Sequence, residues 1–340
     1  MTQQQLAHPP VTAPAPFSND FQVLTGLYQR ELLVHAYRFL GSVDDAEDAL
    51  QESFLRAWRR LDTLKEQAAV RPWLYRIVTN VSLDMLASRK ARSLPPFFAG
   101  PADPQAPLPA PVNEPIWLEP LPDDYLDGQS PSPEARYELH ESVSLAFLAV
   151  LQRLPGRQRA VLILRDVLGW KAQEVAHLLG TSVAAVTSAL QRARATMKEF
   201  EAGPGSNGHA NVSDAETEAL LTRYVQAWEA GDTSHLIELL REDAILTMPP
   251  LPAWYRGRTS IQQFFERQLF AGAAQGRFRL ALSRANGCPA AAVYQAEASG
   301  IFKPASLQVL SLEHGKVARV DCFLTFDNGL FSKFKLPPAV

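Results

Sequence analysis

The sequence predicts a multidomain protein with two all-α helical domains followed by a C-terminal α+β domain. Three observations support this division. At 340 residues, the chain is long enough to bury more than one core. A proline-rich stretch and a shorter glycine-rich stretch interrupt the chain. Hydrophobic residues recur at helical spacing before the second interruption, whereas β-rich runs appear only after it.

Proline marks the first domain boundary. Between residues 101 and 133 there are ten prolines, six acidic residues and no lysine or arginine. A packed domain rarely tolerates that density, so we expect an extended, acidic linker over 95–133. GPGSNGH predicts a second linker, at 203–212, and the Pro, Ala and Gln content of residues 1–16 predicts a disordered tail. The predicted domains therefore cover 17–94, 134–202 and 213–336.

The composition is that of an ordinary soluble protein, with 46% hydrophobic residues, 20% charged residues and a formal net charge of −3. This charge does not favour nucleic acid, so any DNA-binding surface must rest on local clusters. No signal peptide or membrane span is expected. Cys288 and Cys322 are too few for a disulfide framework and lack metal-ligand spacing, which predicts a reducing, cytoplasmic setting with no metal and no cofactor.

In the first domain, hydrophobic residues recur at helical spacing over 43–61, and acidic residues cover the other faces. The segment 71–92 carries five basic residues against one acidic residue. Arg76 and Asn80 lie four positions apart in this segment, so both are expected on one helix face.

The second domain contains two predicted helices within 171–198, separated at Gly180-Thr181-Ser182. Glycine permits the end of the first helix, and a hydroxyl can cap the next. Small and polar residues face outward on the second helix and arginines follow them, as in a helix-turn-helix that enters the major groove. A two-helix hairpin in an ordinary bundle is the alternative. The outward residues are Ala184, Ala185, Thr187, Ser188, Gln191, Arg192 and Arg194.

The third domain is predicted to be helical up to about Leu269 and β-rich afterwards, with a hairpin turn at His314-Gly315. Helices followed by strands indicate an α+β domain, and we expect a curved antiparallel sheet.

Two motifs resemble a known family. LPGRQRAVLILRDVLGWKAQEVAHLLGTSVAAVTSALQRARATM (154–197) is similar to region 4 of bacterial sigma-70 factors of the extracytoplasmic-function class, group 4. DDAEDALQESFLRAWRRLDTL (44–64) resembles sigma region 2.2, and RPWLYRIVTNVSLDMLASRKAR (71–92) resembles regions 2.3 and 2.4. The resemblance implies a sigma factor, not an enzyme. It would bind core RNA polymerase through the β′ and β subunits, recognise and melt promoter DNA, and start transcription.

The resemblance also assigns residues. An acidic helix would meet the β′ coiled coil through Asp45, Asp48, Gln51, Glu52 and Phe54, although Phe54 can equally belong to the core. The melted −10 strand needs cations and polar or aromatic groups, and the positions that match are Arg76, Asn80, Arg89, Lys90 and Arg92. The seven outward residues of the helix-turn-helix would read the −35 element, with Arg192 and Arg194 on phosphates.

The remaining motifs resemble parts of sigma factors with an extra domain. WLEP (117–120) is similar to a linker signature of these proteins, and an unstructured acidic strand could thread the polymerase channel. A spacer with one incidental tryptophan is the alternative. MPPLPAWYRGR (248–258) resembles a piece of the SnoaL-like, NTF2-type cone, which encloses an apolar pocket and implies a regulatory domain. The residues expected to line this pocket are Met248, Trp254, Tyr255, Asp321 and Phe323. A small ligand of this domain, or an anti-sigma factor, is a further candidate partner, whereas a membrane is not.

Two other functions remain open from the sequence. A helix-turn-helix regulator could bind DNA without polymerase, although residues 44–92 count against it. A SnoaL-like cyclase or isomerase could carry a DNA-binding appendage, because the cone hosts several chemistries. Its catalytic base would be Asp321, Glu297 or His314.

Overall fold

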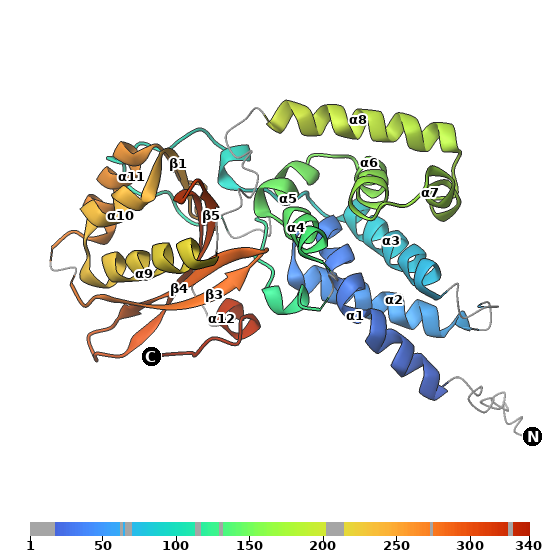
Figure 1. Ribbon diagram of the computed structural model, residues 1–340, viewed down its shortest axis with the longest axis horizontal. Helices are drawn as coiled ribbons and strands as arrows, with labels where there is room; N and C mark the ends of the chain where they lie inside the picture. The colour runs from blue at the N-terminus through green and yellow to red at the C-terminus, as the bar shows by residue number, and fades with distance from the viewer. Residues whose placement is uncertain are drawn as a thin grey trace, which may run out of the picture.

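The computed structural model describes residues 18–61, 64, 70–112, 117–128, 132–201, 214–272, 275–325 and 329–340. The tail predicted over 1–16 and the linker predicted over 203–212 lie outside the described residues. Helices make up one part of the molecule, and a sheet with its own helices makes up the other (Figure 1). Among the described residues, no helix has the length and hydrophobicity of a transmembrane span.

The first helical domain contains α1 (Ser18–Leu40), α2 (Val43–Trp58) and α3 (Val70–Ser88). Gly41 ends α1 with a φ of 67°, a conformation that glycine adopts without strain. The Ser42 hydroxyl then caps α2 by accepting a hydrogen bond from the Asp45 amide at 3.2 Å. The predicted helix at 43–61 is thus confirmed, and small residues such as Ala46 and Ala49 form its buried side.

The second helical domain contains the helix-turn-helix. Its elements are α4 (Pro133–Glu141), α5 (Leu145–Leu151), α6 (Gly156–Leu162), the π-turn η5 (Ile163–Val167), α7 (Ala172–Leu178) and α8 (Val183–Glu201). The break between α7 and α8 lies where the sequence predicts it. Gly180 has a φ of 59°, and the Ser182 hydroxyl accepts from the Ala185 amide at 3.2 Å.

The proline-rich segment is not an unstructured strand. It contains the short 3₁₀ turns η3 (Pro95–Phe97) and η4 (Asp123–Tyr125). Trp117, Leu118 and Leu121 are buried, and the amides of Ala102 and Val112 donate to the C-terminal domain. The expectation of an extended linker over 95–133 is therefore corrected for these residues, because its hydrophobic side chains find cover between the domains.

The C-terminal domain is α+β, as predicted, and its sheet has the strand order β2-β1-β6-β5-β4-β3. The helical elements are α9 (Asp214–Ala230), α10 (Thr233–Leu239), α11 (Arg258–Phe264), the π-turn η6 (Phe265–Leu269) and α12 (Gly329–Lys333). The strands are β1 (Leu240–Thr247), β2 (Trp254–Arg256), β3 (Phe278–Ala285), β4 (Cys288–Ala296), β5 (Phe302–Glu313) and β6 (Lys316–Leu324).

One hairpin was predicted correctly, whereas two features of the sheet were not. His314 and Gly315 have φ values of 50° and 70° and form a two-residue loop between β5 and β6. However, β1 and β2 lie within the part expected to be helical, and β1 pairs with β6 in parallel. The sheet is therefore mixed. A parallel pair joins segments far apart in sequence, which hydrophobic periodicity does not report.

The two faces of the sheet lie in different cores. On β4, Ala291 and Val293 point to a core that also contains side chains of α9, α10 and α11. Ala292 and Tyr294 point the other way, into a core shared with both helical domains and with Leu118 and Leu121 of the linker. The three predicted domains therefore share one continuous apolar cluster.

Candidate nucleic-acid and protein interfaces

The outer face of α2 carries a stripe of four exposed residues, called here the α2 stripe. Asp48 and Gln51 belong to it and were predicted to contact the polymerase. Leu55 and Trp58 complete it, with 54% and 47% of their surface exposed. These positions are spaced three and four apart, so they share one helix face. Sequence reasoning missed both apolar residues, although their spacing from Gln51 was the available signal.

The other residues predicted for this interface point elsewhere or are partly buried. The Asp45 carboxylate pairs with Arg89 and, at 2.9 Å, with Arg92. Glu52 is half-exposed and pairs with Arg56 at 2.7 Å. Phe54 is partly buried and packs against the shared core, which favours the alternative that it is a core residue.

The outer face of α3 presents Arg76 and Asn80, which are both exposed. A groove of about 650 Å³ runs along this helix, and Arg76 lines it together with Trp73, Trp170 and Lys171. Trp170 and Lys171 belong to the second helical domain, which therefore lies beside the face predicted to hold the −10 strand.

The remaining basic residues predicted for the −10 strand are placed differently. Arg92 is nearly buried. It donates to the carbonyl of Trp117 at 2.9 Å, to Glu119 at 3.2 Å and to Asp45. Arg89 also pairs with Asp45, and Lys90 is exposed at the end of the segment. Arg92 thus fastens the linker to α2 instead of facing outward with Asn80.

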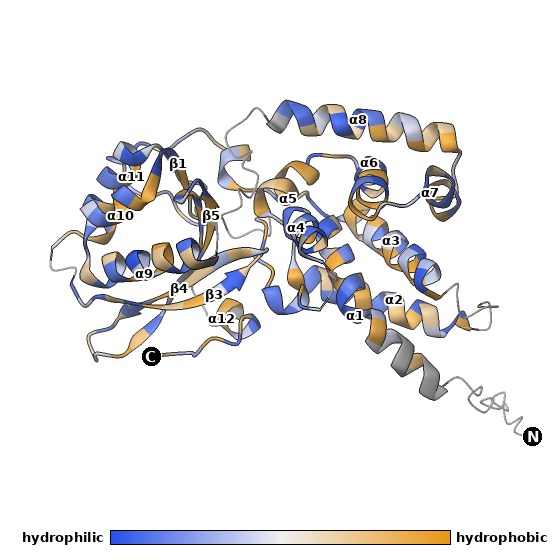
Figure 2. Cartoon of the chain, in the orientation of Figure 1, coloured by the Kyte–Doolittle hydropathy of each residue, from blue (hydrophilic) through white to orange (hydrophobic). Residues whose placement is uncertain are grey.

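All seven residues predicted to read the −35 element are exposed on α8. Figure 2 colours the first turn of α8 hydrophobic and shows hydrophilic positions further along the helix. Arg194 makes two hydrogen bonds with Asp166, at 2.7 and 2.8 Å, whereas no described residue pairs with Arg192.

The first helix of the helix-turn-helix, α7, is capped by a carboxylate. Glu174 accepts a hydrogen bond from the Lys171 amide at 2.6 Å, at the position that precedes the helix.

The five residues predicted to line a pocket do not converge on one cavity. Met248 and Tyr255 are in the core beneath α9–α11, where the rings of Tyr255 and Phe264 stack with their centroids 4.6 Å apart. The Trp254 indole donates to the Ala99 carbonyl at 2.8 Å, and Phe323 lies in the core on the opposite face of the sheet. The prediction is corrected because successive residues of a strand face opposite sides of the sheet.

No predicted catalytic base sits free in an apolar site. Both oxygens of Asp321 accept from the Arg319 guanidinium, at 2.8 and 2.9 Å. One of them also accepts from the Thr247 hydroxyl at 2.7 Å. Glu297 is exposed and pairs with Lys303 at 2.9 Å, and His314 lies on an exposed turn. Among the described residues, no cluster of histidine, cysteine and carboxylate side chains could hold a metal ion.

Comparison with known proteins assigns each of the three domains to a family. The family models for Sigma-70 region 2, Sigma-70 region 4 and the SnoaL-like domain match residues 24–92, 144–197 and 221–333. Regions 2 and 4 in this order define a sigma-70 type of transcription factor. Within that class, the chain belongs to the ECF RNA polymerase sigma factors.

Two relatives from Mycobacterium tuberculosis illustrate the relationship. The chain is 44% identical to the ECF RNA polymerase sigma factor SigG over 323 residues, which is 94% of this chain and 85% of SigG. It is 31% identical to SigJ over 231 residues, 67% of this chain and 64% of SigJ. The crystal structure of SigJ shares the fold, with a TM-score of 0.58 at 24% identity, over 94% of this chain and 99% of that one.

The family establishes the activity. The chain acts with core RNA polymerase on promoter DNA, directs promoter recognition in transcription initiation and is not an enzyme. The match to region 2 and the similarity over nearly the whole chain exclude a regulator that works without polymerase. Membership of the sigma-factor family over nearly the whole chain also decides against an enzyme with a DNA-binding appendage.

Proposed function

We propose that three exposed faces perform the sigma activity and that the SnoaL-like domain regulates how they are presented. The α2 stripe docks on core polymerase. Arg76 and Asn80 of α3 hold the −10 strand as it melts, because a guanidinium suits phosphate and an amide offers both a donor and an acceptor to a base. The seven outward residues of α8 meet the −35 element. A cytoplasmic location, where polymerase and promoter meet, belongs to the same proposal.

The regulatory part rests on one observation, the core that all three domains share. Regions 2 and 4 are in direct contact. The buried Arg159 of α6 donates to the Phe39 carbonyl at the end of α1 and to Gln152 at 2.8 Å. By their names, the −10 and −35 elements are about 25 base pairs apart, or roughly 85 Å along B-form DNA. Regions in contact must separate to reach both elements, so the described arrangement is a closed one.

The DNA-binding part is tested at Arg192. Replacing Arg192 with alanine removes one cation that faces no carboxylate in the described structure, so one phosphate contact is lost. We expect weaker binding to most −35 sequences alike and a salt slope reduced by about one unit. The measurement is binding of the polymerase holoenzyme to promoter DNA across salt concentrations. Arg256→Ala, an exposed arginine of the C-terminal domain, is the control. A change in the preferred −35 base would contradict the assignment of Arg192 to phosphate.

A further inference from the structure

The turn between β3 and β4 leaves the C-terminal domain and enters the junction of the other domains. Its two residues, Asn286 and Gly287, have φ values of 56° and 73°, as a two-residue hairpin turn requires. Turns of this kind usually lie in solvent. Asn286, however, is fully buried. We call these two residues the β3–β4 turn.

The backbone amide of Asn286 and both polar atoms of its side chain have partners outside its own domain. Its amide donates to the Leu121 carbonyl at 2.9 Å, and its side-chain oxygen accepts from the Leu121 amide at 2.9 Å. Its side-chain nitrogen donates to the Tyr37 hydroxyl at 2.9 Å and to the Val143 carbonyl at 2.7 Å. One side chain therefore joins region 2, the linker and the entry to region 4.

Gly287 permits this approach because it has no side chain. A Cβ atom there would lie 2.5 Å from the Cβ and 2.9 Å from the Cα of His140 in α4. The Gly287 amide donates to Asp123 at 2.8 Å, and Arg284 pairs with the same carboxylate at 3.1 Å. Burial raises the pKa of Asp123, and these two contacts oppose that rise.

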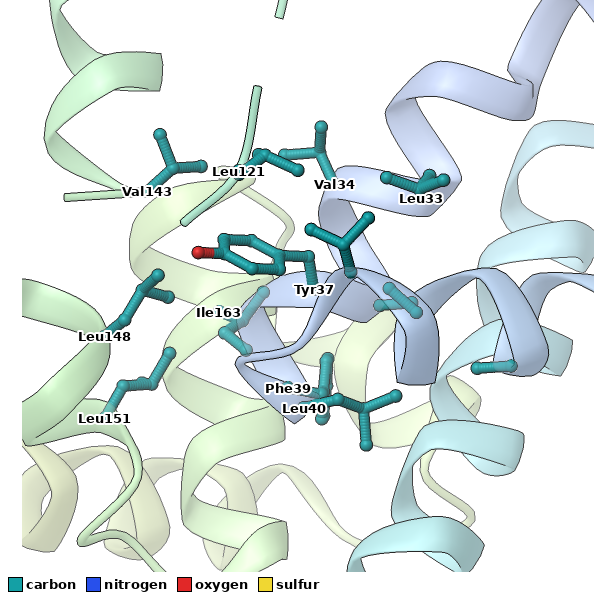
Figure 3. Packing of buried hydrophobic residues seen from close by; sticks show 14 of the residues in the cluster. Leu33, Val34, Tyr37, Phe39, Leu40, Leu121, Val143, Leu148, Leu151 and Ile163 are labelled. Atoms are coloured by element: carbon teal, nitrogen blue, oxygen red, sulfur yellow. The ribbon is translucent and has the colours of Figure 1, made fainter. Parts of the chain in front are cut away.

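Tyr37 shows where the β3–β4 turn acts. Its hydroxyl donates to the Glu119 carbonyl at 2.5 Å, and its ring is completely buried. Figure 3 shows the ring between linker and region 4 side chains, including Leu121, Val143 and Leu148. The hydroxyl thus accepts from Asn286 at the point where region 2, the linker and region 4 meet. Burial raises the pKa of Tyr37, so the hydroxyl stays protonated.

A second contact from the C-terminal domain reaches the same linker. Glu119 accepts from the Ser42 hydroxyl at 2.9 Å and from the Val43 amide at 3.2 Å, so it caps the start of α2. Lys333 of α12 pairs with Asp44 at 2.7 Å and lies 3.7 Å from Glu119. These ion pairs are partly exposed and therefore weaker than the buried contacts of Asn286.

We propose that the β3–β4 turn is an intramolecular latch that holds regions 2 and 4 in the closed arrangement. With the turn inserted, Tyr37, Leu121 and Val143 are tied to one side chain, and separation of the regions requires its withdrawal. Once withdrawn, the same polar groups are hydrated, so the two arrangements differ by a few hydrogen bonds and the latch can be reversible. The latch rests on the regulatory role proposed for the SnoaL-like domain and identifies the contact that performs it.

The most informative variant is Asn286→Gly. Glycine keeps the positive φ and the turn, and it removes only the side-chain bonds. The matched control is His314→Gly, which makes the same change in the exposed β5–β6 turn of the same domain. Gly287→Val tests the approach to His140. Arg284→Ala removes the ion pair with Asp123, and Arg284 itself is half-exposed.

The experiment uses the full chain with fluorophores on Ser88→Cys in region 2 and Lys198→Cys in region 4. Energy transfer reports the distance between the regions, and core-polymerase affinity is measured alongside run-off transcription. We expect Asn286→Gly and Gly287→Val to lower energy transfer and to raise polymerase affinity about tenfold or more, the effect of losing two or more buried hydrogen bonds. Arg284→Ala should shift both quantities less, and His314→Gly should shift neither.

Two outcomes separate the latch from the regulatory role. If Asn286→Gly and Arg284→Ala keep native circular dichroism, energy transfer and polymerase affinity, the latch is wrong. If removal of residues 203–340 nevertheless changes transcription, regulation stands and runs through another surface. If that removal has no effect either, the regulatory role fails as well. If Gly287→Val does not fold, the measurements on Asn286→Gly and Arg284→Ala still decide whether the latch exists.

Discussion

His35 illustrates how a buried residue supports an exposed one. It lies completely buried between α1 and α3, where a ring nitrogen bonds the Thr79 hydroxyl at 2.9 Å. Burial, with smaller contributions from Arg38 and Arg71, lowers its pKa to about 3. The ring is therefore neutral at physiological pH. Thr79 directly precedes Asn80, so this bond fixes the helix that presents the predicted −10 residue.

A pH dependence follows from this shift. The folded-state pKa of His35 lies below the ordinary 6.5, so the folded protein resists protonation that the unfolded chain accepts. Its contribution to stability is complete above pH 6.5 and is lost as pH falls towards about 3. We expect the free energy of unfolding to fall by about 2 kcal/mol between pH 7.5 and pH 5 through this residue alone.

Denaturant unfolding of His35→Gln at the two pH values measures the effect. The variant should be less stable at pH 7.5 but should lose about 2 kcal/mol less than the native chain on acidification. His177→Gln, at an exposed position of α7, is the control and should keep the native pH dependence. Equal losses in the native chain and in His35→Gln would show that His35 is not the titrating group.

At the scale of elements, α2 combines a buried side of small residues with an exposed apolar end. Leu55 and Trp58 are about half exposed although regions 2 and 4 are in contact. Among the described aromatic rings, the Trp58 ring contacts only that of Phe21, edge-on, with the ring centroids 5.3 Å apart. Exposed aromatic residues beside charged ones are typical of binding hot spots. The α2 stripe is therefore available to a partner without any rearrangement of α2 itself.

Trp58→Ala should weaken binding to core polymerase by about 2 kcal/mol, or roughly thirtyfold, because a large apolar anchor is lost. The measurement is the affinity of the full chain for core polymerase. Leu282→Ala, which truncates an exposed apolar residue of β3, is the matched control and should bind normally. Unchanged affinity with native helicity would remove Trp58 from the docking surface.

In the whole molecule, two requirements oppose each other at the shared core: cover for the apolar side chains of the linker, and separation of regions 2 and 4. Apolar side chains of the linker are stable only when covered, which favours the closed arrangement. In the function proposed above, promoter binding needs regions 2 and 4 apart. The SnoaL-like domain contributes residues of β4 and β5 to the same core, so it adds to the closed side of this balance. A ligand or anti-sigma partner would shift the balance only by binding one arrangement better.

Truncation at Gly203 tests this balance and leaves both sigma regions intact. We expect run-off transcription with core polymerase to rise severalfold, because cover is removed from the linker and the closed arrangement loses stability. The comparison is made across temperature and salt at the promoter the full chain recognises, with helicity as the control for folding. Identical transcription by the truncated and full-length chains would end the regulatory proposal.

Features that depend on near neighbours along the chain could be predicted from the sequence alone. Helical spacing located α2, and glycine with a hydroxyl located the break between α7 and α8. His314-Gly315 located one hairpin. The exposed faces of α3 and α8 followed from the same periodicity, because which side of a helix is apolar is written in residues three and four apart.

Features that depend on distant segments appear only once the chain has folded. Parallel pairing of β1 with β6 and burial of Trp117 in the linker each need a partner far along the chain. So does the bond between Asp45 and Arg92, which turns a predicted docking residue and a predicted DNA contact into one ion pair. Asn286-Gly287 reads as an ordinary hairpin turn. Its insertion between Tyr37, Leu121 and Val143 exists only after three domains have packed, because no local pattern records a contact across more than a hundred residues.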